Sequence, residues 1–259
     1  LIISQHGGHF GMSPFSFHEE HQIEISDNWI SWGWEDQKRT QIIPFGNTTN
    51  IGINIKHEPT GGALMVDMAI SRYSNHMSAF PTSSQWLDYF DEQKRFLKAL
   101  PIELRKQVVV RLKGDYGWDQ LDRWRDQFPE VVIDKGHKRI TEQIRKNRLY
   151  IATYNATVYL DLFVWNIPTL IFWKPEHWEI NDNSMPYFDI LKSAGILHDT
   201  PESAARKMAL VWDNIDTWWY SNKVQSARRQ FCQKFSKISD GSLNELTNII
   251  LKALKKQEV

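Results

Sequence analysis

The chain has 259 residues, of which 41% are apolar and 24% charged, a composition that is ordinary for one large or two small soluble domains. Its 31 basic residues balance its 31 acidic residues, which excludes a global field that would recruit nucleic acid or an anionic membrane, so any anionic ligand needs a local site. The one cysteine, Cys232, excludes an internal disulfide and suits a reducing cytosol, and no run of about 18 apolar residues could span a bilayer.

The first stretch combines strand-like segments with a glycine-rich loop. Residues 1–4 are typical of the end of a buried strand, which delivers Gln5 and His6 into a loop whose glycines let backbone N–H groups approach a ligand. Alternating apolar residues predict a second strand over residues 23–34, with Asp27 in its middle. Because the chain opens inside a strand without an initiator methionine, we expect that part of a domain precedes it.

Imidazoles and carboxylates gather before residue 22. The members of this cluster are His6, His9, His18, Glu19, Glu20 and His21. Groups of these types shift each other's pKa when they are close, which is typical of acids, bases and nucleophiles. A zinc site built from the four histidines is the alternative, but the spacing differs from HExxH, and we predict no metal.

A change in composition follows, and then a regular alternation of strands and helices. Residues 36–60 are first charged and then rich in Gly, Asn, Thr and Pro, which predicts a domain boundary, with one domain ending within residues 1–45 and another occupying 60–259. We predict strands at 63–70, 107–112, 130–134, 149–153 and 168–173, and helices at 84–100, 118–128, 140–146 and 156–165. This order predicts an α/β fold, a Rossmann-like parallel sheet with flanking helices.

The end of the chain is predicted to be a helical tail. Its helices are expected at 186–194, 201–216, 221–237 and 241–256. The last one carries Leu243, Leu246, Ile250 and Leu254 on one stripe. We expect this stripe to dock on the sheet; a partner domain or a membrane surface are the alternatives.

The clearest ligand-binding pattern of the second domain lies where the strand at 149–153 passes into a helix. Thr153, Asn155 and Thr157 place hydroxyl and amide groups at the start of that helix, whose free N–H groups suit a phosphate. An ordinary N-cap, with Asp161 satisfied inside the fold, is an equally weighted alternative.

A second set of polar groups follows the strand at 107–112. Arg111 and Lys113 project from one side of this strand, at the edge of the sheet where nucleotides bind, and fit a phosphate or a sugar carboxylate. The alternative is a solvated strand end with Lys113 paired to Asp115. The loop 71–76 is a third and weaker signal at the same edge.

Several short motifs together resemble a known family. They are Gln5-His6-Gly7-Gly8, the run from Glu20 to Asp27 with the pattern Glu-His-x-x-x-Ile-Ser-Asp, Trp32-Gly33-Trp34, Thr153-Tyr-Asn-Ala-Thr157 and Asn166-Ile-Pro168. With them the sequence resembles a bacterial family of transferases for surface-carbohydrate synthesis, and more distantly the retaining β-Kdo glycosyltransferases and the glycerophosphate transferases of teichoic acid synthesis. The similarity runs from His6 to about Phe235.

This resemblance implies a GT-B-like architecture, with the C-terminal remnant of an acceptor-side Rossmann-like domain followed by a nucleotide-sugar-binding one. It assigns catalytic positions to His6, to Asp27 as the nucleophilic carboxylate and to Glu20 as acid or base. Arg111, Lys113 and the segment from Thr153 through Asn155 to Thr157 would hold the nucleotide phosphate without a metal.

The resemblance also implies substrates and a location. The expected reaction transfers a sugar, with Kdo or a related acidic sugar as the leading choice and CMP as its activating nucleotide, to a growing cell-surface polysaccharide, and it needs no cofactor besides this donor. Its partners would be the nucleotide sugar and a glycan acceptor, in the cytoplasm or against the cytoplasmic face of the inner membrane. A phosphopolyol transferase that uses CDP-glycerol, or a non-catalytic glycan-binding relative, are the alternatives.

Overall fold

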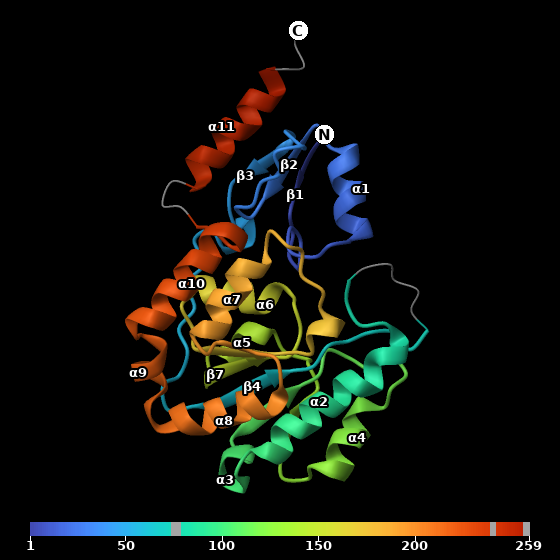
Figure 1. Ribbon diagram of the computed structural model, residues 1–259, viewed down its shortest axis with the longest axis vertical. Helices are drawn as coiled ribbons and strands as arrows, with labels where there is room; N and C mark the ends of the chain where they lie inside the picture. Colours follow the sequence, from blue (N-terminus) through green and yellow to red (C-terminus); the bar gives the residue numbers. More distant parts are fainter. Residues whose placement is uncertain (74–78, 239–241, 256–259) are drawn as a thin grey trace.

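The computed structural model describes residues 1–73, 79–238 and 242–255, which form two parallel sheets flanked by helices (Figure 1). Residues 74–76 of the loop predicted over 71–76 therefore lie outside the described residues. The predicted α/β class with parallel sheets is confirmed.

The first sheet contains three parallel strands in the order β1 (Ile2–Ser4), β2 (Asn28–Ser31) and β3 (Ile42–Pro44). Helix α1 (Phe17–Ile25) connects the first two. The strand predicted from residue 23 is thus wrong in its first part, because Ile23 and Ile25 belong to the helix. Parallel neighbours need a crossover connection, and this requirement overrides a short alternation of two isoleucines.

The second sheet has six strands in the order β6-β5-β4-β7-β8-β9, and every neighbouring pair is parallel. The strands are β4 (Gly62–Val66), β5 (Val108–Arg111), β6 (Val132–Asp134), β7 (Asn147–Ala152), β8 (Thr169–Phe172) and β9 (Leu197–His198). The chain starts in the middle and winds outward in both directions, as in a Rossmann-like fold. Its strand order reverses between β4 and β7, so a crevice is expected at the carboxyl ends of those strands.

Helices cover both sides of this sheet, and one more helix follows near the end of the chain. Their bounds are α2 (Trp86–Ala99), α3 (Ile102–Arg105), α4 (Gln120–Gln127), α5 (Ile140–Ile144), α6 (Thr157–Val164), α7 (Met185–Ser193), α8 (Pro201–Val211), α9 (Ile215–Trp219), α10 (Asn222–Phe235) and α11 (Ser242–Lys255), with 3-10 turns η1 (Thr48–Asn50), η2 (Ser83–Gln85), η3 (Pro175–His177) and η4 (Trp212–Asn214). Figure 1 shows α6, α7 and α10 on the side toward the first sheet, with α2 and α8 on the other. The predicted helix at 201–216 is in fact divided into α8, η4 and α9.

Burial of aromatic side chains stabilises these layers. Of the 12 tryptophans, all but Trp165 and Trp218 are buried. Trp86 stacks on Trp118, with ring centroids 4.3 Å apart, between α2 and the loop after β5. The tryptophans are therefore used mainly for packing, each large ring adding apolar contact area to the core.

The segment between the two sheets is held against the second one. Asn47 donates from its side chain to the carboxylate of Asp161 on α6 (3.2 Å) and to the hydroxyl of Ser236 (3.0 Å). Its backbone N–H donates to the carbonyl of Lys237, whose own N–H donates to the carbonyl of Trp32, the residue after β2. Residues 45–50, predicted as part of a linker, thus connect the first sheet with α6 and the end of α10.

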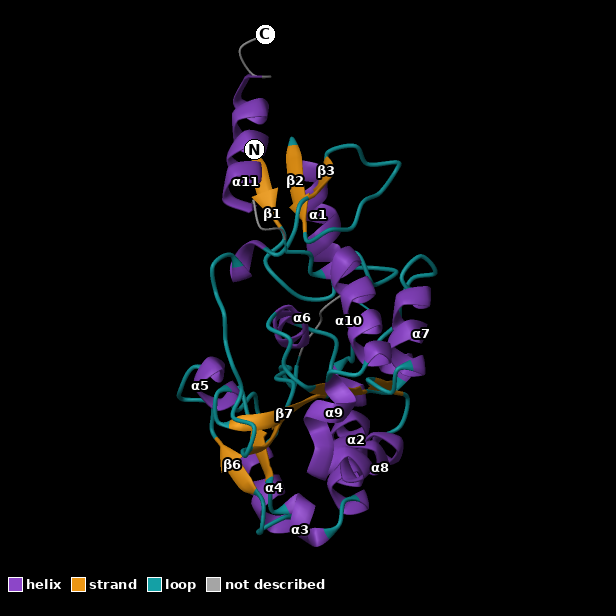
Figure 2. Ribbon diagram, turned by 90° about the vertical axis from the view of Figure 1, so that its left-hand side faces the viewer, coloured by secondary structure: helices purple, strands orange, loops and turns teal. Residues whose placement is uncertain are grey.

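Helix α11 lies beyond the end of α10, at the level of the first sheet (Figure 2). Its Leu243 is 65% exposed and Ile250 is 39% exposed, so the predicted docking of an apolar stripe on the sheet is not observed for these side chains. The side chain of Leu254 lies outside the described residues. Among the helices in the described part of the chain, none is long and apolar enough to cross a membrane.

Candidate functional site

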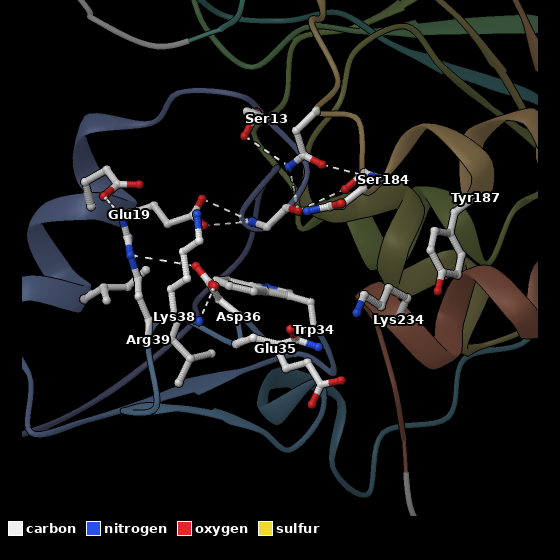
Figure 3. Close-up of a pocket in the computed structure, with 17 residues that line it drawn as sticks. Ser13, Glu19, Trp34, Glu35, Asp36, Lys38, Arg39, Ser184, Tyr187 and Lys234 are labelled. Carbon is white, nitrogen blue, oxygen red and sulfur yellow. Dashed lines mark hydrogen bonds and ion pairs between the residues drawn. The ribbon is translucent and has the colours of Figure 1, made fainter.

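A polar pocket of about 680 Å³ lies between the first sheet with its helix α1 and the start of α7 (Figure 3). Residues from both halves of the chain line it: Gly11, Ser13, Glu19, Glu20, Ile23, Trp34, Glu35, Asp36, Gln37, Lys38, Arg39, Ile42, Asn181, Asn183, Ser184, Tyr187 and Lys234. Concave sites with convergent polar groups at the junction of two units are the usual position of ligands. This pocket is therefore the candidate functional site.

Gly11 joins the two walls of the pocket. Its N–H donates to both carboxyl oxygens of Glu19 (3.0 and 3.1 Å), and its carbonyl accepts from the side chains of Asn181 (3.1 Å) and Ser184 (3.0 Å). Its φ is +75°, and a Cβ there would lie 2.5 Å from the ring of Trp34. Only glycine combines this left-handed backbone with such a close approach to a ring.

The loop before Gly11 is fixed by Gln5. The Gln5 side-chain oxygen accepts from the backbone N–H of Trp32 (3.0 Å) and from the indole N–H of Trp34 (2.9 Å). The Gln5 carbonyl accepts from the indole N–H of Trp32 (2.9 Å). Because Gln5 is buried, these bonds are protected from water and position Trp34 as one wall of the pocket.

Glu19 is the most perturbed acid of the pocket. Its pKa is raised to about 8, because burial raises it more than the bond from Gly11 lowers it; the nearby charge of Glu20 also raises it and that of Arg39 lowers it. The carboxyl is therefore mostly protonated at pH 7 and can donate a hydrogen bond or a proton. A buried carboxyl with a strongly shifted pKa in a pocket is a typical functional-site signal.

Glu20 lines the same pocket and forms an ion pair with Arg39, with 2.6 Å between its carboxyl oxygen and the guanidinium nitrogen. Arg39 also lies 3.8 Å from Asp36. The sequence motif pointed to Glu20, whereas burial singles out the neighbouring Glu19. The spacing Ser16-x-x-Glu19 resembles a helix capping box and could have indicated the helix, but no side-chain cap forms and Glu19 accepts from Gly11 instead.

The loop that carries His6 contacts the start of α6. The N–H of Gly8 donates to the hydroxyl of Thr157 (2.9 Å), so the structure brings these two predicted regions together. His6 is exposed, lies 3.2 Å from the side-chain nitrogen of Gln22 on α1, and packs edge-on against Phe10. Thr157 is thus used to hold the loop of His6.

Asp27 lies apart from this contact. It immediately precedes β2, and its side chain is 67% exposed. In the parallel register Ile2 is opposite Asn28 and Ser4 is opposite Ile30, so Asp27 is at the amino end of the sheet and His6 beyond the carboxyl end of β1. The structure does not bring Asp27 together with His6 and Thr157.

Thr153 and Asn155 are buried after β7, near the point where the strand order reverses. The Thr153 hydroxyl donates to the carbonyl of Val66 (2.8 Å) and is 2.8 Å from the hydroxyl of Tyr89. The Asn155 side-chain oxygen accepts from the hydroxyl of Tyr159 (2.8 Å). These polar groups bond inside the fold at the edge where a nucleotide was predicted.

Arg111 also bonds inside the fold. Its guanidinium pairs with Asp134 on β6 and donates to the carbonyls of Gly136 (3.4 Å) and Lys138 (2.5 Å). Lys113, two residues later, is exposed. The planar guanidinium thus ties β5 to the loop after β6, a task that suits its fixed fork of donors.

We expect Arg111→Lys to lower the free energy of unfolding by about 1–2 kcal/mol, because an ammonium cannot reach Asp134 and both carbonyls together. Urea titration of the two proteins measures this, and the exposed Lys113→Arg is the control that should change little. Equal stability of Arg111→Lys and the unchanged protein would show that these bonds do not hold the loop.

The histidines of the N-terminal cluster differ in environment. The pKa of His9 is lowered to about 4, chiefly by burial and also by the nearby His18. His21 is exposed and stacks on Phe17. Within the described ranges, no group of three or more His, Cys, Asp or Glu side chains is arranged to hold a metal ion.

Comparison with known proteins now gives the family. The sequence model of the LIC12162 family transferase matches residues 1–250. The chain belongs to this transferase family. No curated protein matches this family member in sequence.

Solved structures share its fold. A structure of the wall teichoic acid polymerase TagF aligns with this protein at a TM-score of 0.51 and 14% identity. The alignment covers 99% of the chain described here and 68% of the TagF chain. S. aureus TarM aligns over 95% of this chain and 50% of its own, with a TM-score of 0.55 and 14% identity. The likeness agrees with the GT-B-like α/β class that the sequence predicts.

Proposed function

We propose that this member of the LIC12162 family is a glycosyltransferase that moves a sugar from a nucleotide-activated donor to a cell-surface polysaccharide. The observation that carries the proposal is the pocket whose walls come from both halves of the chain, with the buried carboxyl of Glu19 in its lining. A site of this kind can exchange a proton with an acceptor hydroxyl while it holds the reacting groups away from water.

In this proposal the two halves of the chain bind different substrates. Residues 1–45 supply the acceptor side and residues 60–259 bind the donor nucleotide, whose phosphate would approach the start of α6 and the exposed Lys113. In this proposal the binding needs no metal or further cofactor, because the backbone N–H groups supply partial positive charges and Lys113 a full one. Glu19, with Glu20 and Arg39 beside it, is our leading acid or base.

The donor is proposed by chemical class. A sugar activated by CMP, of the Kdo type, remains our first choice. TagF has been soaked with CDPG, and TarM has been solved with UDP and alpha-GlcNAc-glycerol, so CDP- and UDP-activated donors belong in the same panel. Turnover of the intact protein with this panel decides between a sugar and a phosphopolyol, and the absence of turnover with all donors would contradict the proposal.

We expect His6→Ala to reduce kcat/KM for the accepted donor by about 10²–10⁴-fold, the usual contribution of a positioned acid or base. The physical reason is that the imidazole of His6 is exposed and can exchange a proton with a substrate, while the bond from Gly8 to Thr157 holds its loop in place. The matched control is His21→Ala, which removes another exposed imidazole from the same region. Similar activity of the two variants would remove His6 from the reaction.

A further inference from the structure

We propose that the pocket between α1 and α7 takes a neutral, hydroxyl-rich group, a sugar or polyol unit of the acceptor, and that the donor phosphate binds elsewhere. The inference rests on the proposed function, which it deepens by assigning a substrate class to this pocket. Three observations support this assignment: the charges of the lining, the bonded N–H groups at the start of α7, and the mixture of polar and apolar residues in the walls.

The lining carries no excess of positive formal charge. The acidic side chains besides Glu19 are Glu20, Glu35 and Asp36, and the basic ones are Lys38, Arg39 and Lys234. Arg39 is already paired with Glu20 and lies close to Asp36. Burial raises the pKa of Glu19 to about 8, so this carboxyl adds no positive charge at any pH. A phosphate would therefore meet no excess of positive charge, whereas a neutral ligand needs none.

The start of α7 is also unsuited to a phosphate. The N–H of Ser184 donates to the side-chain oxygen of Asn181 (2.9 Å), and the N–H of Met185 donates to the backbone carbonyl of Asn181 (3.0 Å). The N–H of Tyr187 donates to the carbonyl of Ser184 (3.0 Å). Since these donors are already bonded, the helix end cannot offer them to an anion without losing those bonds.

The walls fit a ligand with hydroxyl groups and small apolar faces. Ile23, Trp34 and Ile42 give an apolar floor. Figure 3 shows Tyr187 and Lys234 on the wall opposite Glu19 and Arg39. A protonated carboxyl, a phenol and an ammonium can each donate to a sugar hydroxyl, and the phenol and the other carboxylates can accept from one. Polar groups around an apolar floor are the usual lining of a small-molecule site.

The test blocks the pocket without touching its supports. Asn183 is exposed and lines the pocket, whereas its neighbour Asp182 is exposed and does not. Asn183→Trp should fill the entrance, and Asp182→Trp is the matched control. The intact protein is probed with neutral methyl glycosides and glycerol by saturation-transfer NMR, and with inorganic phosphate by phosphorus line broadening.

We expect at least one neutral probe to show saturation transfer that falls five-fold or more in Asn183→Trp and persists in Asp182→Trp. In turnover assays, Asn183→Trp should raise KM for the acceptor at least ten-fold and leave KM for the donor within two-fold. Phosphate broadening should be equal in both variants.

Two results would overturn the inference. One is the absence of any neutral-probe signal that depends on the pocket. The other is phosphate broadening that disappears in Asn183→Trp alone. Either result with donor turnover intact rejects only the assigned ligand class, whereas loss of nucleotide binding and turnover in the unchanged protein rejects the proposed function.

Discussion

Gly11→Ala is expected to lower the free energy of unfolding by about 2–5 kcal/mol and to remove transferase activity. The left-handed backbone costs a non-glycine residue about 1–2 kcal/mol, and forcing a methyl group into a filled space costs about 1–3 kcal/mol more. That methyl would lie 2.5 Å from the ring of Trp34, so either the ring or the loop must move. Because the same residue bonds Glu19, Asn181 and Ser184, movement separates the two walls of the pocket.

Gly8→Ala is the matched control for this prediction. Gly8 has a similar φ of +72°, but a Cβ there would meet nothing within 4 Å. The Gly8→Ala variant should therefore lose only the stability that the left-handed backbone costs an alanine, about 1–2 kcal/mol. Urea unfolding of both variants, followed by tryptophan fluorescence, measures the difference. If the two variants lose equal stability, the contact with Trp34 does not restrict the loop.

Glu19→Gln is expected to remove much of the loss of stability that the protein shows as the pH rises from about 4.5 to about 8. The pKa of Glu19 is raised from 4.5 to about 8 in the folded protein, chiefly by burial. The stability contributed by the protonated carboxyl is therefore fully present below pH 4.5 and is lost as the pH rises through about 8. Over this pH range, the free energy of unfolding contributed by Glu19 falls by on the order of 3–5 kcal/mol.

The measurement is the urea midpoint of both proteins at intervals from about pH 5 to pH 9. The glutamine side chain keeps an oxygen that can accept from Gly11, so the variant should match the unchanged protein near pH 5 and exceed it near pH 9. Burial also raises the pKa of Asp67 to about 7 and that of Asp161 to about 6, so both proteins should lose some stability. Only the difference between them reports on Glu19. Glu24→Gln, on the exposed face of α1, is the control. Parallel pH profiles for Glu19→Gln and the unchanged protein would contradict the assigned shift.

The two predictions concern one small region, and they separate its two properties. Gly11→Ala alters the geometry of the loop between the walls, while Glu19→Gln alters a proton and leaves the geometry in place. If transfer depends on proton exchange, Glu19→Gln should remain folded and lose activity. A folded and fully active Glu19→Gln would place the acid or base elsewhere, with Glu20 and His6 as the next residues to test.

Local patterns of the sequence determined much of the second sheet. Runs such as residues 107–112 are apolar because both faces of a central parallel strand are covered, and β5 forms there. Thr200 and Ser221 precede α8 and α10 and accept from the first turn of each helix, as cap residues do. Such signals depend on neighbours within a few residues, so the sequence carries them without knowledge of the fold.

Less of the candidate site could be predicted from the sequence. The sequence pointed to the region of residues 5–21 and to Glu20, but the choice of Glu19 depends on which side of α1 is covered. Likewise, Arg111 looked available to a ligand until its pairing with Asp134 on the adjacent strand was known. Asp27, placed by one motif, is at the opposite end of its sheet from His6, because parallel strands put their starts at one edge and their ends at the other.

The sequence by itself therefore determined the α/β class, the alternation of strands and helices, and the glycine-rich loop after the first strand. Only the tertiary structure decided how that loop is used. Gly8 bonds Thr157 across 149 residues of chain, and Gly11 bonds Asn181 across 170. Burial, and with it the pKa of Glu19, arises from such distant contacts, and a local pattern contains no information about them.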